Sequence, residues 1–165
     1  VFEPEKTQCL WILRPEDAAY RALPEQIKIA AQVSNLSRIH DQPQTDFVLF
    51  KTIVPEERGS WCFHYQRADL SRQMGDWKQV IFFWDLAQRG GYFPGHGFEY
   101  IPFIQAYAHQ GDWSTAFALT KQSNRVSANM KTILCPVWEE LAASTPESAQ
   151  RDSILVDVNK LLGCQ

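Results

Sequence analysis

A five-residue motif that ends in Gly-Asp-Trp occurs twice in this chain, 36 positions apart. Residues 73–77 read Gln-Met-Gly-Asp-Trp, and residues 109–113 read His-Gln-Gly-Asp-Trp. Each copy follows one stretch of helically spaced apolar residues and precedes another. A repeat of this period is typical of stacked helical hairpins, in which the shared motif forms the turn inside each hairpin.

The residues of this motif suit such a turn. Glycine accepts the left-handed backbone that ends a helix tightly. The aspartate after it can cap the next helix by accepting free backbone N–H groups. We therefore expect structural turn roles for six residues: Gly75, Asp76, Trp77, Gly111, Asp112 and Trp113.

The flanking pattern predicts an all-α fold. Ser60 is the expected N-cap of the first hairpin, and a glycine-rich loop over residues 89–97 separates it from the second. Residues 123–129 are polar and are predicted to form a loop. The expected organisation is one helical domain over residues 1–165, with hairpins over 60–125, an N-terminal cap and connector over 1–59, and capping helices over 126–165.

The ends of the chain carry weaker signals. A helix is predicted over residues 24–39. Periodicity allows residues 47–54 to be either a strand or an extended, buried connector, and we favour the connector because a single strand would have no partner. Another helix is expected over residues 130–143, although Pro136 must start, kink or break it. Thr145 is the predicted N-cap of a last helix that ends near Leu162.

Charge and hydropathy exclude some functional classes. The 165 residues include 16 lysines and arginines against 19 acidic residues, a net charge of -3, so we expect no nucleic-acid partner. The longest strictly apolar run, residues 80–84, is too short to be a transmembrane segment. The chain begins at Val1 and not at methionine, which implies either processing or a piece cut from a longer protein, and we favour the piece of a longer protein.

Both hairpins resemble tetratricopeptide repeats, a family that joins two antiparallel helices through a Gly-Asp-aromatic turn. The matching residues are Ala68, Gly75, Trp77, Val80, Trp84 and Ala87 in the first unit, and Tyr100, Phe103, Tyr107, Gly111, Trp113 and Ala116 in the second. Arg67 departs from the pattern, because a large apolar residue is usual there. The resemblance implies a short solenoid of antiparallel helical hairpins with non-repeat capping helices.

A second resemblance covers more of the chain. Residues 9–15, 34–39, 61–70 and 75–77 are similar to the soluble tails of large bacterial multi-pass membrane proteins of glycosyltransferase type. This resemblance implies a C-terminal extracytoplasmic domain that is tethered to the membrane through a missing N-terminal region. Catalysis would then belong to the missing part of the parent protein.

Four cysteines, at positions 9, 62, 135 and 164, have no zinc-like spacing, so we expect no metal site. We interpret them as buried thiols. The alternative is a bridge between Cys9 and Cys164, which would tie the two termini together in an oxidising compartment.

Nothing in the sequence indicates an enzyme. The four histidines are scattered, and the Gly95-His96-Gly97 segment lacks the preceding strand and the following lysine of a phosphate-binding loop. We therefore expect no catalytic residue and no cofactor.

Aromatic residues are the best functional candidates, because there are more of them than two hairpins can enclose in a core. Four of them are expected to form an exposed patch or groove wall: Phe82, Phe83, Tyr92 and Phe93. The predicted function is a non-catalytic interaction module that binds a protein or another domain of its own parent. The alternative is an accessory domain of a membrane glycosyltransferase that contacts a saccharide or a lipid-linked substrate.

Overall fold

The computed structural model describes residues 9, 13–15, 18, 25–35, 37 and 59–164, and this part of the chain is all-helical. The elements are α1 (Glu25–Gln32), α3 (Trp61–Gln73), α4 (Trp77–Arg89), the 3₁₀-helix η3 (Gly97–Tyr100), α5 (Ile101–His109), α6 (Trp113–Val126), α7 (Lys131–Ser144) and α8 (Ala149–Leu162). The prediction of an all-α fold is thus confirmed. The predicted connector over residues 47–54 lies outside the described residues.

The two copies of the repeated motif form the same turn. Gly75 and Gly111 have φ angles of 73° and 80°. The N–H of each glycine donates to a carbonyl three residues back, and the N–H of Asp76 or Asp112 donates to one five residues back, all at 2.9–3.0 Å. This pair of bonds satisfies two carbonyls at the end of a helix and stops it abruptly.

Each turn also starts the following helix as expected. The side chain of Asp76 accepts from the N–H of Gln79 at 3.0 Å, and that of Asp112 accepts from the N–H of Thr115 at the same distance. The Ser60 hydroxyl accepts from the N–H of Phe63 at 3.3 Å, which confirms the predicted N-cap of α3. These bonds satisfy N–H groups that have no partner within the helix.

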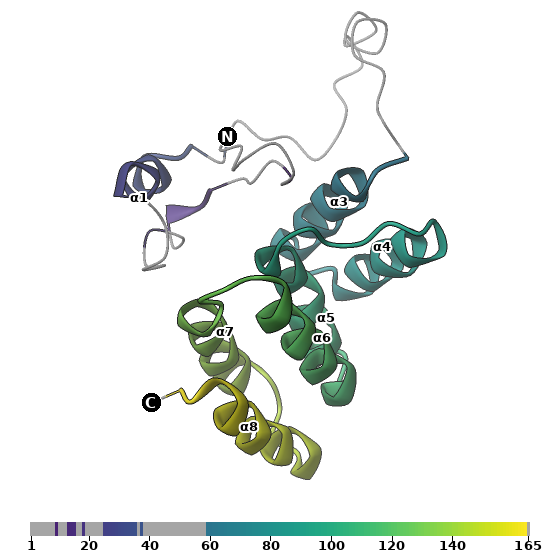
Figure 1. Cartoon of the computed structure of the whole chain (residues 1–165), viewed down its shortest axis with the longest axis vertical. Helices are drawn as coiled ribbons and strands as arrows, with labels where there is room; N and C mark the ends of the chain where they lie inside the picture. Colours follow the sequence, from purple (N-terminus) through teal and green to yellow (C-terminus); the bar gives the residue numbers. More distant parts are fainter. Residues whose placement is uncertain are drawn as a thin grey trace, which may run out of the picture.

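From α3 to α6, each helix packs on the next one in the chain, and α7 and α8 follow at the end of the array (Figure 1). Helix α4 packs on both α3 and α5, α5 also packs on α6 and α7, and α8 packs on α6 and α7. Phe103, Ile104 and Leu134 are fully buried at the centre. Trp61, Trp84 and Phe103 join α3, α4 and α5 through ring centroids 4.7–6.0 Å apart.

Three predicted boundaries are wrong. Helix α1 ends at Gln32, short of the predicted residue 39. Helix α6 continues to Val126 through the predicted loop, because the Ser123 hydroxyl is buried and donates to the carbonyl of Gly97 at 2.8 Å. Ser148, not Thr145, is the N-cap of α8, since its hydroxyl accepts from the N–H of Arg151.

The interpretation of the cysteines as thiols is also wrong, and so is the alternative bridge between Cys9 and Cys164. Cys9 is bonded to Cys62 and Cys135 to Cys164, with Cα–Cα distances of 5.0 and 5.6 Å. Helix α8 packs on α7, which brings Cys164, two residues after the end of α8, beside Cys135 near the start of α7. Each cysteine thus finds a nearer partner than the one at the opposite terminus.

None of the helices among the described residues has both the length and the apolar character that a membrane crossing requires.

Candidate functional site

A groove lies between α3, α4 and the loop after α4, and we call it the α3–α4 groove. Its volume is about 710 Å³. The lining residues are Phe63, His64, Arg67, Phe83, Leu86, Arg89, Gly90 and Tyr92.

Helical spacing explains which residues line this groove. Phe63 and Arg67 stand four apart on α3, and Phe83 and Leu86 stand three apart on α4, so each pair shares one helix face. The guanidinium of Arg67 lies over the Phe63 ring, 5.5 Å from its centroid. This cation–π contact holds the cation beside an apolar wall.

The end of α4 brings Tyr92 into the groove. Gly91 has a φ of 76°, and the N–H of Tyr92 donates to the carbonyl of Ala87 at 2.9 Å, so the chain turns back sharply. The Tyr92 ring lies against Gly90, where an added Cβ would be 2.6 Å from Cε2 of the tyrosine. Only glycine at position 90 leaves room for this ring.

His64 is a buried polar residue of the groove lining. Its side chain is 4% exposed and stacks on Tyr92 with ring centroids 5.5 Å apart. Burial lowers the pKa of His64 and so favours the neutral imidazole. Within the described part of the chain, its buried Nδ1 has no hydrogen-bond partner, which is a costly state for a buried polar atom.

The groove has a positive rim. Arg67 and Arg89 are exposed, and none of the eight lining residues is acidic. Arg89 also lies in the last turn of α4, where a cation suits the carbonyl end of the helix.

The four predicted patch residues gather here only in part. Phe83 and Tyr92 line the groove. Phe82 is 48% exposed and contacts Phe83 edge to face at 5.4 Å, so it extends the apolar surface. Phe93 is 62% exposed but is not among the lining residues.

Sequence reasoning missed the contribution of α3. Phe63, His64 and Arg67 are absent from the predicted patch, although Arg67 is singled out as a departure from the repeat pattern. That departure, four residues after a phenylalanine, is the signal that could have revealed a cation over an aromatic wall.

The predicted turn tryptophans have structural surroundings. Trp77 stacks on His109 with centroids 4.1 Å apart, which joins the two turns. Trp113 is buried and lies 6.3 Å from Trp138 of α7. These residues stabilise packing between helices and do not line the groove.

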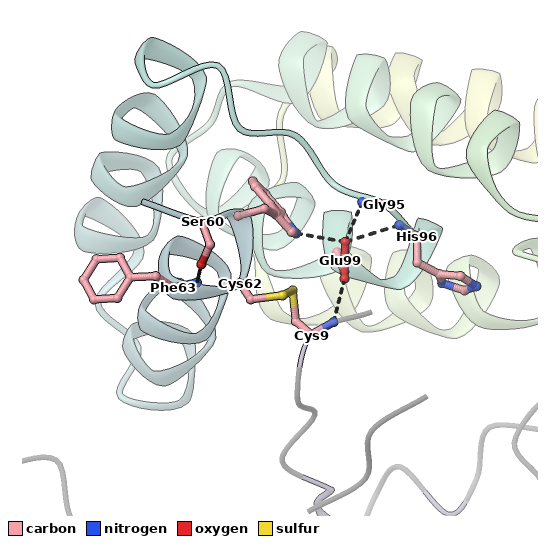
Figure 2. The surroundings of a disulfide bond; sticks show 8 residues. Cys9, Ser60, Cys62, Phe63, Gly95, His96 and Glu99 are labelled. Atoms are coloured by element: carbon pink, nitrogen blue, oxygen red, sulfur yellow. Dashed lines mark hydrogen bonds between the residues drawn. A yellow bond between two sulfur atoms is a disulfide. The ribbon is translucent and has the colours of Figure 1, made fainter. Parts of the chain in front are cut away.

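A buried carboxylate beside the Cys9–Cys62 bridge is a second candidate (Figure 2). Glu99 is 3% exposed. It accepts from the backbone N–H groups of Cys9, Gly95 and His96 and from Nε1 of Trp61, at 2.8–3.2 Å. Because four donors already occupy the carboxylate, Glu99 is a structural junction between the N-terminal segment, α3 and η3.

Two other features of the described residues can be dismissed as reaction centres. No group of three His, Cys, Asp or Glu side chains there lies as the ligands of a metal ion would. A smaller cavity of about 250 Å³ beside the Cys135–Cys164 bridge is lined mainly by packing residues of α7 and α8.

No protein-family model, curated protein or solved structure matches this chain.

Proposed function

We propose that the chain is a non-catalytic helical-repeat module that binds a protein partner, or another domain of its own parent, at the α3–α4 groove. In this proposal α3–α4 and α5–α6 are two tetratricopeptide-like hairpins stacked as a short solenoid, and α7 and α8 cap it. The identical hydrogen bonds of the two turns, 36 residues apart, support the repeat.

The groove is the observation that carries the proposal. Its volume is within the range of sites that hold a small ligand or a few side chains, roughly 300–1,000 Å³. Exposed Phe82 and Leu86 extend its apolar wall on α4, and Phe93 follows nearby in the chain. Aromatic residues at such density are typical of the centre of a protein interface.

A site-specific photocrosslink tests this proposal. A photoreactive phenylalanine analogue in place of Phe82 should crosslink one defined partner in cells that make the native protein. The control places the same analogue at Val156, which is 53% exposed on α8. Binding measured with the purified partner should then weaken at least tenfold in Phe83→Ala, because truncating an aromatic residue at the centre of an interface costs about 2 kcal/mol or more.

Two results would overturn the proposal. One is the same crosslinking pattern from positions 82 and 156. The other is an identified partner whose affinity is unchanged by Phe83→Ala in a variant that retains its helical content.

A second candidate is an accessory domain of a bacterial membrane glycosyltransferase. The two disulfides favour this candidate, because disulfides persist mainly in oxidising compartments outside the cytoplasm. Determining the full reading frame tests it: many hydrophobic spans before Val1 are expected. Titration with a lipid-linked saccharide then tests direct substrate contact, and no binding at millimolar saccharide would exclude that contact.

A further inference from the structure

We propose that the α3–α4 groove recognises a carboxylate that lies next to an aromatic side chain in the partner segment. This inference rests on the proposed function, and it specifies the chemistry of the partner. It combines three features of the groove: aromatic walls, a positive rim and a buried nitrogen that has no hydrogen-bond partner among the described residues.

The aromatic walls select an aromatic side chain. Phe63 and Phe83 line the groove from two helices, and Tyr92 lines it from the loop after α4. Rings prefer offset-stacked and edge-to-face neighbours, as Phe63 already shows with His64 at 5.2 Å. A tryptophan or phenylalanine of the partner buries more apolar area here than an aliphatic residue does.

The rim selects a negative charge beside that ring. Arg67 and Arg89 are the charged residues of the lining, and both are exposed. A guanidinium binds a carboxylate through two parallel hydrogen bonds, which gives direction as well as attraction. In a protein partner, the carboxylates of Asp and Glu are the anions that need no modification.

His64 supplies a hydrogen-bonding group beneath the rim. Its Nδ1 is buried, and among the described residues nothing pairs with it. A neutral imidazole nitrogen either donates or accepts, so the carboxylate or an adjacent backbone group can satisfy it. A ligand that does so removes the cost of an unpaired buried atom.

Three peptides of equal length test this chemistry by calorimetry with the disulfide-intact protein. The first holds a tryptophan followed by two glutamates. The second replaces the glutamates by glutamines, and the third replaces the tryptophan by alanine. We expect the first to bind about tenfold more tightly than either of the others, with an affinity that falls as salt is added.

Variants locate the effect. Replacing both arginines, in Arg67→Gln with Arg89→Gln, should bring the affinities of the glutamate and glutamine peptides within about twofold of each other, because the guanidinium groups that would pair with a carboxylate are gone. Arg125→Gln on α6 is the matched control, since Arg125 is exposed and does not line the groove. His64→Phe keeps a ring against Tyr92 without the nitrogen, and should weaken the first peptide about fivefold.

The outcomes separate this inference from the function on which it rests. Equal binding of the glutamate and glutamine peptides overturns the charge preference and leaves the interaction groove intact. Absence of binding by all three at 1 mM, or a preference that survives the double arginine replacement, overturns the inference as well. The proposed function itself is decided by the crosslink at position 82, which needs no peptide.

Discussion

Removing the Cys135–Cys164 bridge should destabilise the protein by a predictable amount. The two cysteines are 29 residues apart in the sequence. In the chain-entropy account, a crosslink over that separation removes about 12 cal/mol/K from the unfolded state, which is roughly 3.6 kcal/mol at 25 °C. We therefore expect Cys135→Ala with Cys164→Ala to lose between about 3 and 4 kcal/mol of unfolding free energy.

The variant should nevertheless fold. Val158 and Leu162 of α8 stay buried without the bridge, and the Arg151 guanidinium donates to the carbonyl of Thr145 at 2.8 Å. A loss of this size is smaller than the total stability of most domains, about 5–15 kcal/mol. The crosslink therefore adds to a docked helix and does not create the docking.

Urea unfolding followed by tryptophan fluorescence measures the loss. The comparison uses oxidised wild type, the double variant, and a second double variant that removes the Cys9–Cys62 bridge. That second bridge spans 53 residues, so its removal should cost slightly more, roughly 4.1 kcal/mol. A loss below 1 kcal/mol for the first variant, or a peptide map of wild type that links Cys9 to Cys164, would refute the reasoning.

Three further predictions concern the core and its titrating groups. Gly97→Ala should destabilise by about 1–3 kcal/mol in urea unfolding, because the new Cβ would lie 2.7 Å from Cγ of Met130. Glu99→Gln should cost about 1–3 kcal/mol by the same measurement, since an amide leaves at least one of the four donors without an acceptor. Burial lowers the pKa of both His64 and His109 from 6.5, so the unfolded chain binds more protons: stability is complete above pH 6.5 and the urea midpoint should fall as the pH drops from 7.5 to 5.

Substitutions at exposed positions serve as controls for these predictions. Gln122→Ala and Glu139→Gln change exposed residues on α6 and α7, and each should shift the unfolding free energy by less than about 0.5 kcal/mol. Losses in Gly97→Ala or Glu99→Gln no larger than in these controls would contradict the contacts described for them. A urea midpoint that is constant or rises between pH 7.5 and pH 5 would contradict the lowered pKa values of His64 and His109.

Local chemistry explains why the turns could be predicted. Gly75 and Gly111 take a left-handed backbone that other residues avoid, and the aspartate after each caps the next helix within four residues. All the atoms involved belong to residues that are close together in the sequence, so the turn can be predicted without knowing which distant segments pack against it. The same locality holds for Gly163, which ends α8 with a φ of 61°.

The predictions failed where contacts with segments distant in the sequence determine the structure. Ser123 is polar and reads as part of a loop, but η3 supplies a carbonyl 26 residues away, so α6 continues through it. The groove likewise depends on Tyr92 turning back onto His64, a contact across 28 residues that no helical period encodes.

The amino-acid sequence by itself determined the helical class, the two turns and their caps, because propensity, left-handed glycines and N-cap bonds act over a few residues. Tertiary structure alone decided the cysteine partners, the junction around the buried Glu99 carboxylate and the residues that share the α3–α4 groove. Those depend on which helices pack side by side, and packing brings together residues between which the sequence shows no relation.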